Sequence, residues 1–500
     1  MKKERMKKIG KGIFFFLVIA IAVASGILTR NLGDLDEIWN FNFANQMAKG
    51  LVPYRDFNMV QTPLLPMIVS LFLKVFGTQL LVTRILGVFL GAGILFMAYH
   101  ILKKLKVNLY IRLTTLLIFF LLLKNNFALD YNFAVLLLVL FMIALELKKR
   151  KIEKNGKRQR YDLLIGFLAG LCICFKQSTG AFILLATLVI GLWQEKKKGN
   201  WKQYLTNVVI RIIGAVIPVA ILFIYLLVNG ALGDFINYAV LGIQTFSNHL
   251  AYTTLFQNTP VYIKLLAVLF PLTLIFMFFV TWKAKNKKIG ILTAYGIATA
   301  FTMYPITDEI HFLIGALPTF IGFVYILHIV IRRLKIGYQR SKTMRYIRDF
   351  CRCALWLALF IFLGIALEDT ISYIKSADQY QDLPHYSYIR VTDKLEGQIK
   401  NVSQYIQNAS KPVYILDSDA AIYRIPTDGY EKDYDMFLKG NLGIKGEEGQ
   451  IEKLESTQDK ILLIKNDATS LNWQNPEKVR QYVKENYTKV GEIEYFDIYE

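Results

Sequence analysis

Apolar runs of membrane-spanning length, separated by short basic segments, constrain this chain more than any other feature of its sequence. An α-helix needs about 17–25 mainly apolar residues to cross a bilayer. Runs near or within that range fall at 12–28, 79–102, 109–123, 127–147, 162–176, 178–194, 207–229, 261–282, 289–304, 309–331 and 353–368. The sequence therefore predicts an all-α polytopic membrane domain with about eleven transmembrane helices.

The net charge of +21 has its source in the same part of the chain. Residues 1–368 hold 43 Lys and Arg against 15 Asp and Glu, whereas residues 369–500 hold 16 against 23. Basic loops stay on the cytoplasmic side of a membrane, so the excess charge does not indicate nucleic-acid binding. Of the 43 basic residues, 34 lie in the segments 1–11, 103–112, 148–160, 195–202, 283–288 and 332–352.

These basic segments fix a predicted topology in the plasma membrane. The N-terminus is expected in the cytoplasm and the C-terminal segment outside it. Consecutive inside segments require an even number of crossings between them, so 162–194 is predicted to be two short helices that turn near 177–180, and 289–331 a pair that turns at 305–308. The run 12–28 also resembles a signal peptide with a cleavage site at 22–24. We favour an uncleaved helix because another membrane segment follows, and cleavage remains the alternative.

The polar C-terminal segment is expected to form a second domain. We place the boundary between residues 368 and 369, with a small extracytoplasmic α/β domain over 369–500. The apolar patterns predict helices at 385–408, 446–456 and 476–486, and strands at 413–416, 461–464 and 492–498.

Polar residues of the membrane part gather at its predicted outer side. We expect no charge at the middle of any helix, where a charge costs about 2.5–3.5 kcal/mol on insertion scales and where transporters place their ion paths. This pattern disfavours a transporter or polymer-export protein. A non-catalytic scaffold that presents an external binding domain is the other alternative, and it predicts that the outer acids are replaceable.

The first outer segment carries the densest polar pattern. A helix is predicted to begin after Asp34, with Asp36 and Glu37 in its first turn and Gly50 ending it. One helix face is polar and the opposite face is apolar, which is typical of a helix that lies along the membrane surface; the polar face holds Asn42, Asn45, Gln46 and Lys49. Capping is an alternative explanation of the acids, with Asp34 as N-cap and Glu37 completing a capping box.

Several motifs that the topology places outside carry a family resemblance. They are the Asp36-Glu37 pair, Gly50-Leu51-Val52-Pro53-Tyr54-Arg55-Asp56-Phe57, Pro63-Leu64-Leu65-Pro66, Phe127-Ala128-Leu129-Asp130-Tyr131-Asn132, the Gly170–Gln177 stretch with Lys176, and Tyr304-Pro305-Ile306-Thr307-Asp308-Glu309-Ile310-His311. In this order they resemble the GT-C superfamily of membrane glycosyltransferases, and more narrowly the bacterial relatives of protein O-mannosyltransferase and lipid A aminoarabinose transferase.

The resemblance implies transfer of a hexosyl or pentosyl group from a polyprenyl-phosphate donor to an envelope glycan, lipid or protein acceptor at the outer face of the membrane. It implies no required cofactor. The residues agree with a lipid-linked donor, because neither a P-loop nor a dinucleotide-binding glycine pattern is present. A nucleotide sugar would in any case be found in the cytoplasm.

Direct displacement at a sugar carbon needs a carboxylate base and cations for the leaving phosphate. We expect Asp36 to be the base, Glu37 to position the acceptor and Asp130 to be a second acid. The residues expected to bind substrate or phosphate are Lys176, Arg84, Arg55, Asp308 and His311. The simpler alternatives are that Lys176 snorkels to the interface, that Arg84 is a structural partner of an outer acid, that Asp130 caps its own helix and that His311 is an ordinary satisfied polar residue. Asp34 and Asp36 also resemble a D-x-D motif, which leaves a divalent cation open as an alternative.

Overall fold

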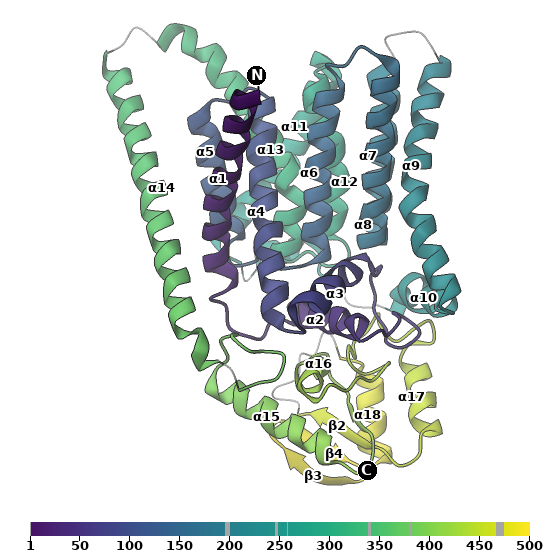
Figure 1. Cartoon of the computed structure of the whole chain (residues 1–500). Helices are drawn as coiled ribbons and strands as arrows, with labels where there is room; N and C mark the ends of the chain where they lie inside the picture. Colours follow the sequence, from purple (N-terminus) through teal and green to yellow (C-terminus); the bar gives the residue numbers. More distant parts are fainter. Residues whose placement is uncertain are drawn as a thin grey trace. The chain divides into compact units, whose positions relative to one another are not determined.

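The computed structural model describes residues 2–195, 201–245, 249–257, 259–338, 342–380, 382–466 and 475–500, and helices dominate it (Figure 1). The chain divides into two compact units. Unit 1 comprises Met1–Thr29, Ile85–Ala220 and Leu250–Tyr373, and unit 2 comprises Arg30–Arg84, Ile221–His249 and Ile374–Glu500. Unit 2 thus combines the first predicted outer segment with the C-terminal segment, while the domain boundary expected at 368 stays a prediction.

Each of the apolar runs is helical. The helices are α1 (Lys2–Ile27), α4 (Leu80–Lys104), α5 (Leu109–Leu123), α6 (Tyr131–Lys149), α7 (Asn155–Phe175), α8 (Gln177–Glu195), α9 (Trp201–Val228), α11 (Val261–Ala284), α12 (Lys287–Ala300), α13 (Glu309–Tyr338) and α14 (Lys342–Ser376). In the described part of the chain, seven of them are long and apolar enough to cross a membrane: α1, α4, α6, α9, α11, α13 and α14. The protein is therefore a multi-pass membrane protein, and eleven crossings remain a prediction.

The two helix pairs inferred from charge parity are present in unit 1. α7 ends at Phe175 and α8 begins at Gln177, so only Lys176 separates them, and the second pair is α12 and α13. Two glycines let α7 approach α9 closely. A Cβ on Gly166 would collide with the carbonyl oxygen of Arg211, and one on Gly170 with that of Ala215. The glycine of the 170–177 motif therefore has a packing role of its own.

A cluster of buried charges in unit 1 contradicts the expectation that charges avoid helix interiors. Arg211 of α9 lies 2.7 Å from Glu146 and 2.7 Å from Asp162, and Lys149 lies 2.6 Å from Asp162. All four side chains are fully buried, and they come from α6, α7 and α9. Two cations and two carboxylates balance each other, which is what allows them to be enclosed among apolar helices. We call these four residues the buried quartet.

Unit 2 mixes helices with one sheet. The longer elements are α2 (Leu35–Ala48), α3 (Leu64–Phe76), α15 (Asp393–Asn408), α17 (Gly446–Ser456), α18 (Glu477–Asn486), β1 (Val413–Ile415), β2 (Ile461–Lys465), β3 (Lys489–Ile493) and β4 (Phe496–Tyr499). Short helices of either unit are α10 (Leu232–Phe235), η2 (Ile236–Leu241), η3 (Gly242–Thr245), η4 (Tyr252–Phe256), η5 (Phe301–Met303), η6 (Ala377–Gln379), α16 (Ala420–Arg424) and η7 (Ile425–Thr427). The sheet order is β1-β2-β4-β3, with β1 and β2 parallel and the other pairs antiparallel.

The C-terminal segment departs from the sequence prediction at two points. The helix expected from residue 385 begins only at Asp393, after Thr392 caps it through the backbone N–H of Leu395. The single strand expected at 492–498 is a hairpin, because the chain reverses at Glu494, whose φ of 52° lies in the left-handed region. The other predicted helices and strands lie within one residue of their observed positions at nearly every end.

Helix α2 does not lie on a surface as its polar face had suggested. Asn42, Asn45 and Gln46 are each only 1% exposed. Asn42 donates a hydrogen bond to Asp435 at 3.3 Å, and the Trp39 indole donates to the carbonyl of Ser418 at 2.8 Å. The C-terminal segment contacts this helix within unit 2, and the amide groups of Asn42 and Gln46 donate to protein oxygens rather than to lipid headgroups or water.

Cysteine labelling of intact cells would test the predicted orientation. Cys351 and Cys353 are exposed, so both are first replaced by serine, whereas Cys172 and Cys174 are buried. With Lys478→Cys, we expect a membrane-impermeant maleimide to react in intact cells, because the basic segments place this region outside. With Glu153→Cys, reaction should require permeabilised cells. The reverse pattern would refute the orientation.

Candidate functional site

The predicted site residues form two clusters, one in each unit. In unit 2, Asp34, Asp36, Glu37 and Arg84 lie at or against the start of α2, whereas Arg55 follows α2 in the chain and contacts Asp56. Asp34 is the N-cap, and its Oδ1 accepts the backbone N–H groups of Asp36 (3.1 Å) and Glu37 (3.4 Å). Its Oδ2 lies 3.4 Å from Arg30. Burial, with the nearby negative charge of Glu37, raises the pKa of Asp34. The capping interpretation of Asp34 is confirmed.

This geometry does not suit a metal ion on the Asp34-x-Asp36 motif. Oδ1 of Asp34 accepts hydrogen bonds from the first turn of α2, and Oδ2 pairs with Arg30. A hard cation, in contrast, needs several free oxygen ligands. Across the described residues, no group of three or more His, Cys, Asp or Glu side chains is arranged to hold a metal. We therefore derive no step through a metal.

Glu37 forms a buried ion pair with Arg84 instead of completing a capping box. The guanidinium Nε and Nη2 of Arg84 lie 2.9 Å from the two Glu37 oxygens, and the residues are 1% and 6% exposed. Arg84 also donates to the carbonyls of Arg30 at 2.5 Å and Asn31 at 3.4 Å. Such a two-point pair fixes position as well as charge, so it anchors the first turn of α2 to α4.

The other predicted residues of unit 2 are more open. Asp36 is partly exposed and directly precedes the buried Glu37, and its carbonyl accepts a hydrogen bond from Asn40 at 2.8 Å. Arg55 pairs with its neighbour Asp56 through two 2.8 Å contacts, and the Arg55 side chain is 47% exposed. The hydrogen bond from Arg55 lowers the pKa of Asp56. An exposed pair of this kind contributes little to stability.

Unit 1 brings the remaining predicted residues together. Asp130 caps α6 by accepting the backbone N–H of Asn132 at 2.7 Å through Oδ1. Its Oδ2 is buried without a hydrogen-bond partner. Lys176, at the α7–α8 junction, donates to the Asn132 side chain at 2.8 Å and lies 5.4 Å from the Tyr131 ring centroid. Asp130 therefore fulfils the capping role and still offers one free acceptor.

His311 completes this unit 1 cluster. Its Nδ1 lies 2.8 Å from Asp308, whose same oxygen accepts the His311 backbone N–H at 2.8 Å. Burial opposes ionisation of Asp308, but the bonds from His311 outweigh it and lower the pKa of Asp308. Burial raises the pKa of Asp130, against the opposing charges of His311 and Lys176. The carboxylate of Asp130 thus interacts electrostatically with the ammonium group of Lys176 and with the imidazole of His311.

Sequence reasoning missed some polar partners. Asn132 links Asp130 to Lys176; it stands in the 127–132 motif, but it is uncharged and was not predicted as a site residue. In unit 2, His385 lies between the Thr78 carbonyl (2.6 Å) and Asp428 (2.9 Å), and Asp428 also contacts Lys49 at 2.7 Å. No motif surrounds His385 in the sequence. The buried quartet did have a signal, because Arg211 falls inside the apolar run 207–229.

Comparison with known proteins identifies the fold. No family model and no curated protein matches the sequence. The chain is similar to ArnT from Cupriavidus metallidurans bound to undecaprenyl phosphate, with 10% identity, 98% of both chains covered and a TM-score of 0.58. It is similar to the same protein in the apo state, with 11% identity, 99% and 98% coverage and the same TM-score. An Archaeoglobus fulgidus oligosaccharyltransferase tethered to an acceptor peptide gives 11% identity, 90% and 69% coverage and a TM-score of 0.51. These proteins are GT-C glycosyltransferases, so the resemblance is confirmed at the level of the fold.

Proposed function

We propose that this chain is a membrane glycosyltransferase that moves a sugar from a polyprenyl-phosphate carrier to an acceptor at the outer face of the membrane. The observation that carries the proposal is the cluster of unit 1, where the unpaired Oδ2 of Asp130 shares its surroundings with Lys176 and His311. The GT-C fold supports the same reaction, since the similar ArnT structure holds undecaprenyl phosphate.

The reaction is a direct displacement at the anomeric carbon. The acceptor oxygen or nitrogen forms a bond to this carbon, the bond to the phosphate oxygen breaks, and polyprenyl phosphate leaves with the bonding electrons. The acceptor proton goes to a carboxylate, for which we assign Asp36. A general base contributes roughly 10²–10⁴-fold to such a rate. In this scheme Glu37, held by Arg84, positions the neighbouring Asp36.

Cationic groups stabilise the departing phosphate. Lys176 carries an ammonium group at the junction of two short helices, at headgroup depth in the predicted topology. Arg55 is the second phosphate ligand in this proposal. Its ion pair with Asp56 is exposed and contributes little to stability, so Arg55 can leave Asp56 and bind a phosphate instead. Arg84 would have to leave the buried Glu37 to bind phosphate, so its contacts favour a positioning role. Asp130 acts as the second acid, and Asp308 orients His311 toward the substrate.

Substitution of Lys176 tests the phosphate role. Lys176→Gln is expected to lower kcat/KM for the carrier about 10- to 100-fold, because a charged hydrogen bond of about 1.5–3 kcal/mol is lost. Lys176→Arg keeps the charge with a different shape and should retain part of the activity. The assay is turnover of a synthetic polyprenyl-phosphate sugar in nanodiscs. Lys264→Gln is the matched control, because Lys264 lies in the first turn of α11, which the basic segments place at the outer side. An equal loss in both variants would reduce Lys176 to an ordinary interfacial lysine.

Mass spectrometry of cell-envelope glycans tests the function itself. Deletion of the gene should remove one sugar from a glycan, lipid or protein of the envelope, and the wild-type gene should restore it. Loss of the polyprenyl-linked donor in the deletion strain, instead of its accumulation, would indicate a role in donor synthesis or export and contradict the proposal.

A further inference from the structure

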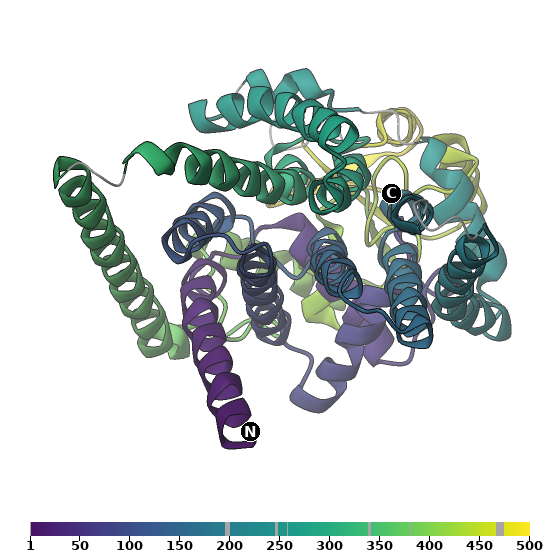
Figure 2. The same cartoon turned by 90° about the horizontal axis from the view of Figure 1, so that it is seen from above.

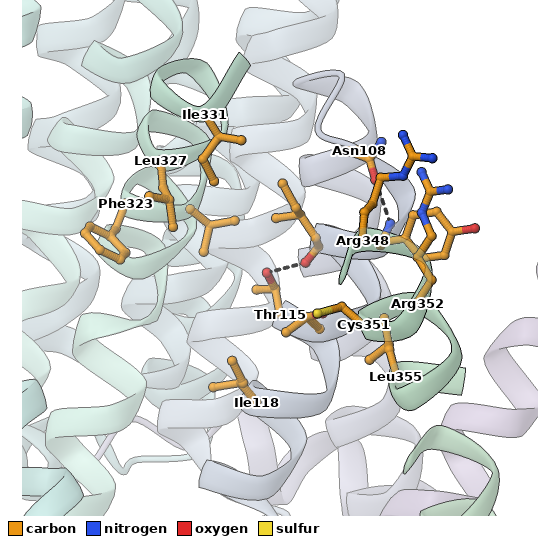
Figure 3. A pocket seen from close by; sticks show the side chains of 14 residues that line it. Asn108, Thr115, Ile118, Phe323, Leu327, Ile331, Arg348, Cys351, Arg352 and Leu355 are labelled. Carbon is orange, nitrogen blue, oxygen red and sulfur yellow. Dashed lines mark hydrogen bonds between the residues drawn. The ribbon is translucent and has the colours of Figure 1, made fainter. Parts of the chain in front are cut away.

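A cavity of about 440 Å³ lies between α5, α13 and α14, all within unit 1 (Figure 3). Its walls are mostly aliphatic and aromatic, and they include Ile118, Phe323, Leu327 and Leu355. The hydroxyl of Thr115 is used within its own helix, where it donates to the Ile111 carbonyl at 2.7 Å. The cavity therefore offers its occupant apolar surface along most of its length.

One end of the cavity is basic. Arg348 and Arg352 of α14 line it there beside Asn108, as Figure 3 shows. Both guanidinium groups contact Asp349 at 3.0 Å, and that of Arg352 also lies 4.5 Å from the ring centroid of Tyr110. Two arginines thus share a single carboxylate, which leaves a net charge of about +1 at the apolar groove. An occupant with one negative charge and an apolar tail matches this arrangement.

Among the described residues, little protein packs against the apolar face of helix α14. Figures 1 and 2 show it standing apart from α5 and α13 over much of its length. Its apolar side chains are correspondingly exposed, with Phe360 at 80%, Leu357 at 62% and Ile361 at 52%. In a membrane this surface is covered by lipid chains, so a lipid is the natural occupant of a cavity that α14 helps to enclose.

We propose that an anionic phospholipid binds in this cavity, with its phosphodiester against Arg348 and Arg352 and an acyl chain along α5 and α13. The lipid joins α14 to the other helices of unit 1. The site is separate from the cluster around Asp130. On α13, His311 and Ile331 are 20 residues apart, which corresponds to about 30 Å along a helix. By charge asymmetry, the basic end faces the cytoplasmic leaflet, where phospholipids are anionic.

Native mass spectrometry of the full chain from mixed phosphatidylglycerol and phosphatidylcholine nanodiscs tests the proposal. The wild type is expected to retain phosphatidylglycerol selectively. The double variant Arg348→Gln and Arg352→Gln should weaken this retention about 25-fold, because a basic residue near an anionic headgroup contributes roughly fivefold in affinity. The matched control, Lys151→Gln with Lys154→Gln, removes two exposed charges from another basic segment and should leave retention unchanged.

Two further measurements keep the test independent of how the arginine variants fold. Leu327→Trp fills the groove and should reduce retention, whereas Leu357→Trp, at an exposed position of α14 outside the cavity, should not. In the wild type, phosphatidylglycerol should slow maleimide labelling of Cys351, which lines the cavity, but not of Cys353, which is also exposed and does not line it.

Specific results would overturn the proposal. They are equal retention in the arginine and lysine variants, unchanged labelling of Cys351, displacement by inorganic phosphate alone, or a preference for polyprenyl phosphate over phosphatidylglycerol. Each readout is lipid binding rather than sugar transfer. The proposal can therefore fail while the glycosyltransferase function holds, and the reverse is equally true.

Discussion

Asp130→Asn is expected to reduce sugar transfer at least about 100-fold while the protein remains folded. Asparagine is as good an N-cap as aspartate, so the bond to the Asn132 backbone N–H survives. The substitution replaces the unpaired, buried Oδ2 with an amide nitrogen and removes the negative charge beside Lys176 and His311. Turnover of a polyprenyl-phosphate sugar in nanodiscs measures the loss.

The same substitution elsewhere provides the control. Asp34→Asn also replaces an N-cap, but both Asp34 oxygens are already occupied by the helix and Arg30. We expect this variant to keep most of its activity. Asp36→Asn should lose activity on the scale of a missing general base, roughly 10²–10⁴-fold. Full activity in Asp130→Asn and Asp36→Asn would favour the non-catalytic scaffold. Inactivity of Asp34→Asn would instead favour a divalent cation bound at the Asp34-x-Asp36 motif.

Arg211→Leu is expected to destabilise the protein by about 3–5 kcal/mol, because it leaves the buried Glu146 without a counter-charge and Asp162 with Lys149 alone. The measurement is the unfolding temperature of the purified chain in detergent. Neutralising all four residues, with Glu146→Gln, Asp162→Asn and Lys149→Met added, should restore much of the stability. If the single variant were as stable as the wild type, the quartet would not be enclosed as described.

The helices could be predicted from the sequence because membrane spans depend on apolar length, which is a local property. The turn between α7 and α8 followed from charge parity, since the basic segments on either side need an even number of crossings. Parity could not locate the buried quartet, however. Averaging hydropathy over the run 207–229 conceals Arg211, and only three-dimensional packing brings Glu146 and Asp162 against it.

The candidate site was predictable in part. Asp34 and Asp130 occupy the cap positions that their spacing from the following helices suggests, but the sequence could not reveal that one Asp130 oxygen stays unpaired. The polar face of α2 was assigned to a surface because its periodicity shows which residues share a face, not what covers that face. The residues that contact this face of α2 include Ser418 and Asp435, which lie almost 400 residues further along the chain.

The buried quartet also has a consequence for the order of biosynthesis. Glu146, Lys149 and Asp162 are made first, and Arg211 follows 49 residues after Asp162. At about 5–20 residues per second, the ribosome needs roughly 2–10 s for that interval. During this time Lys149 can neutralise only one of the two carboxylates, so α6 and α7 carry an uncompensated charge until α9 is synthesised. We therefore expect integration of α6 and α7 to be complete only when α9 arrives, and a nascent chain that stops before α9 to keep that uncompensated charge.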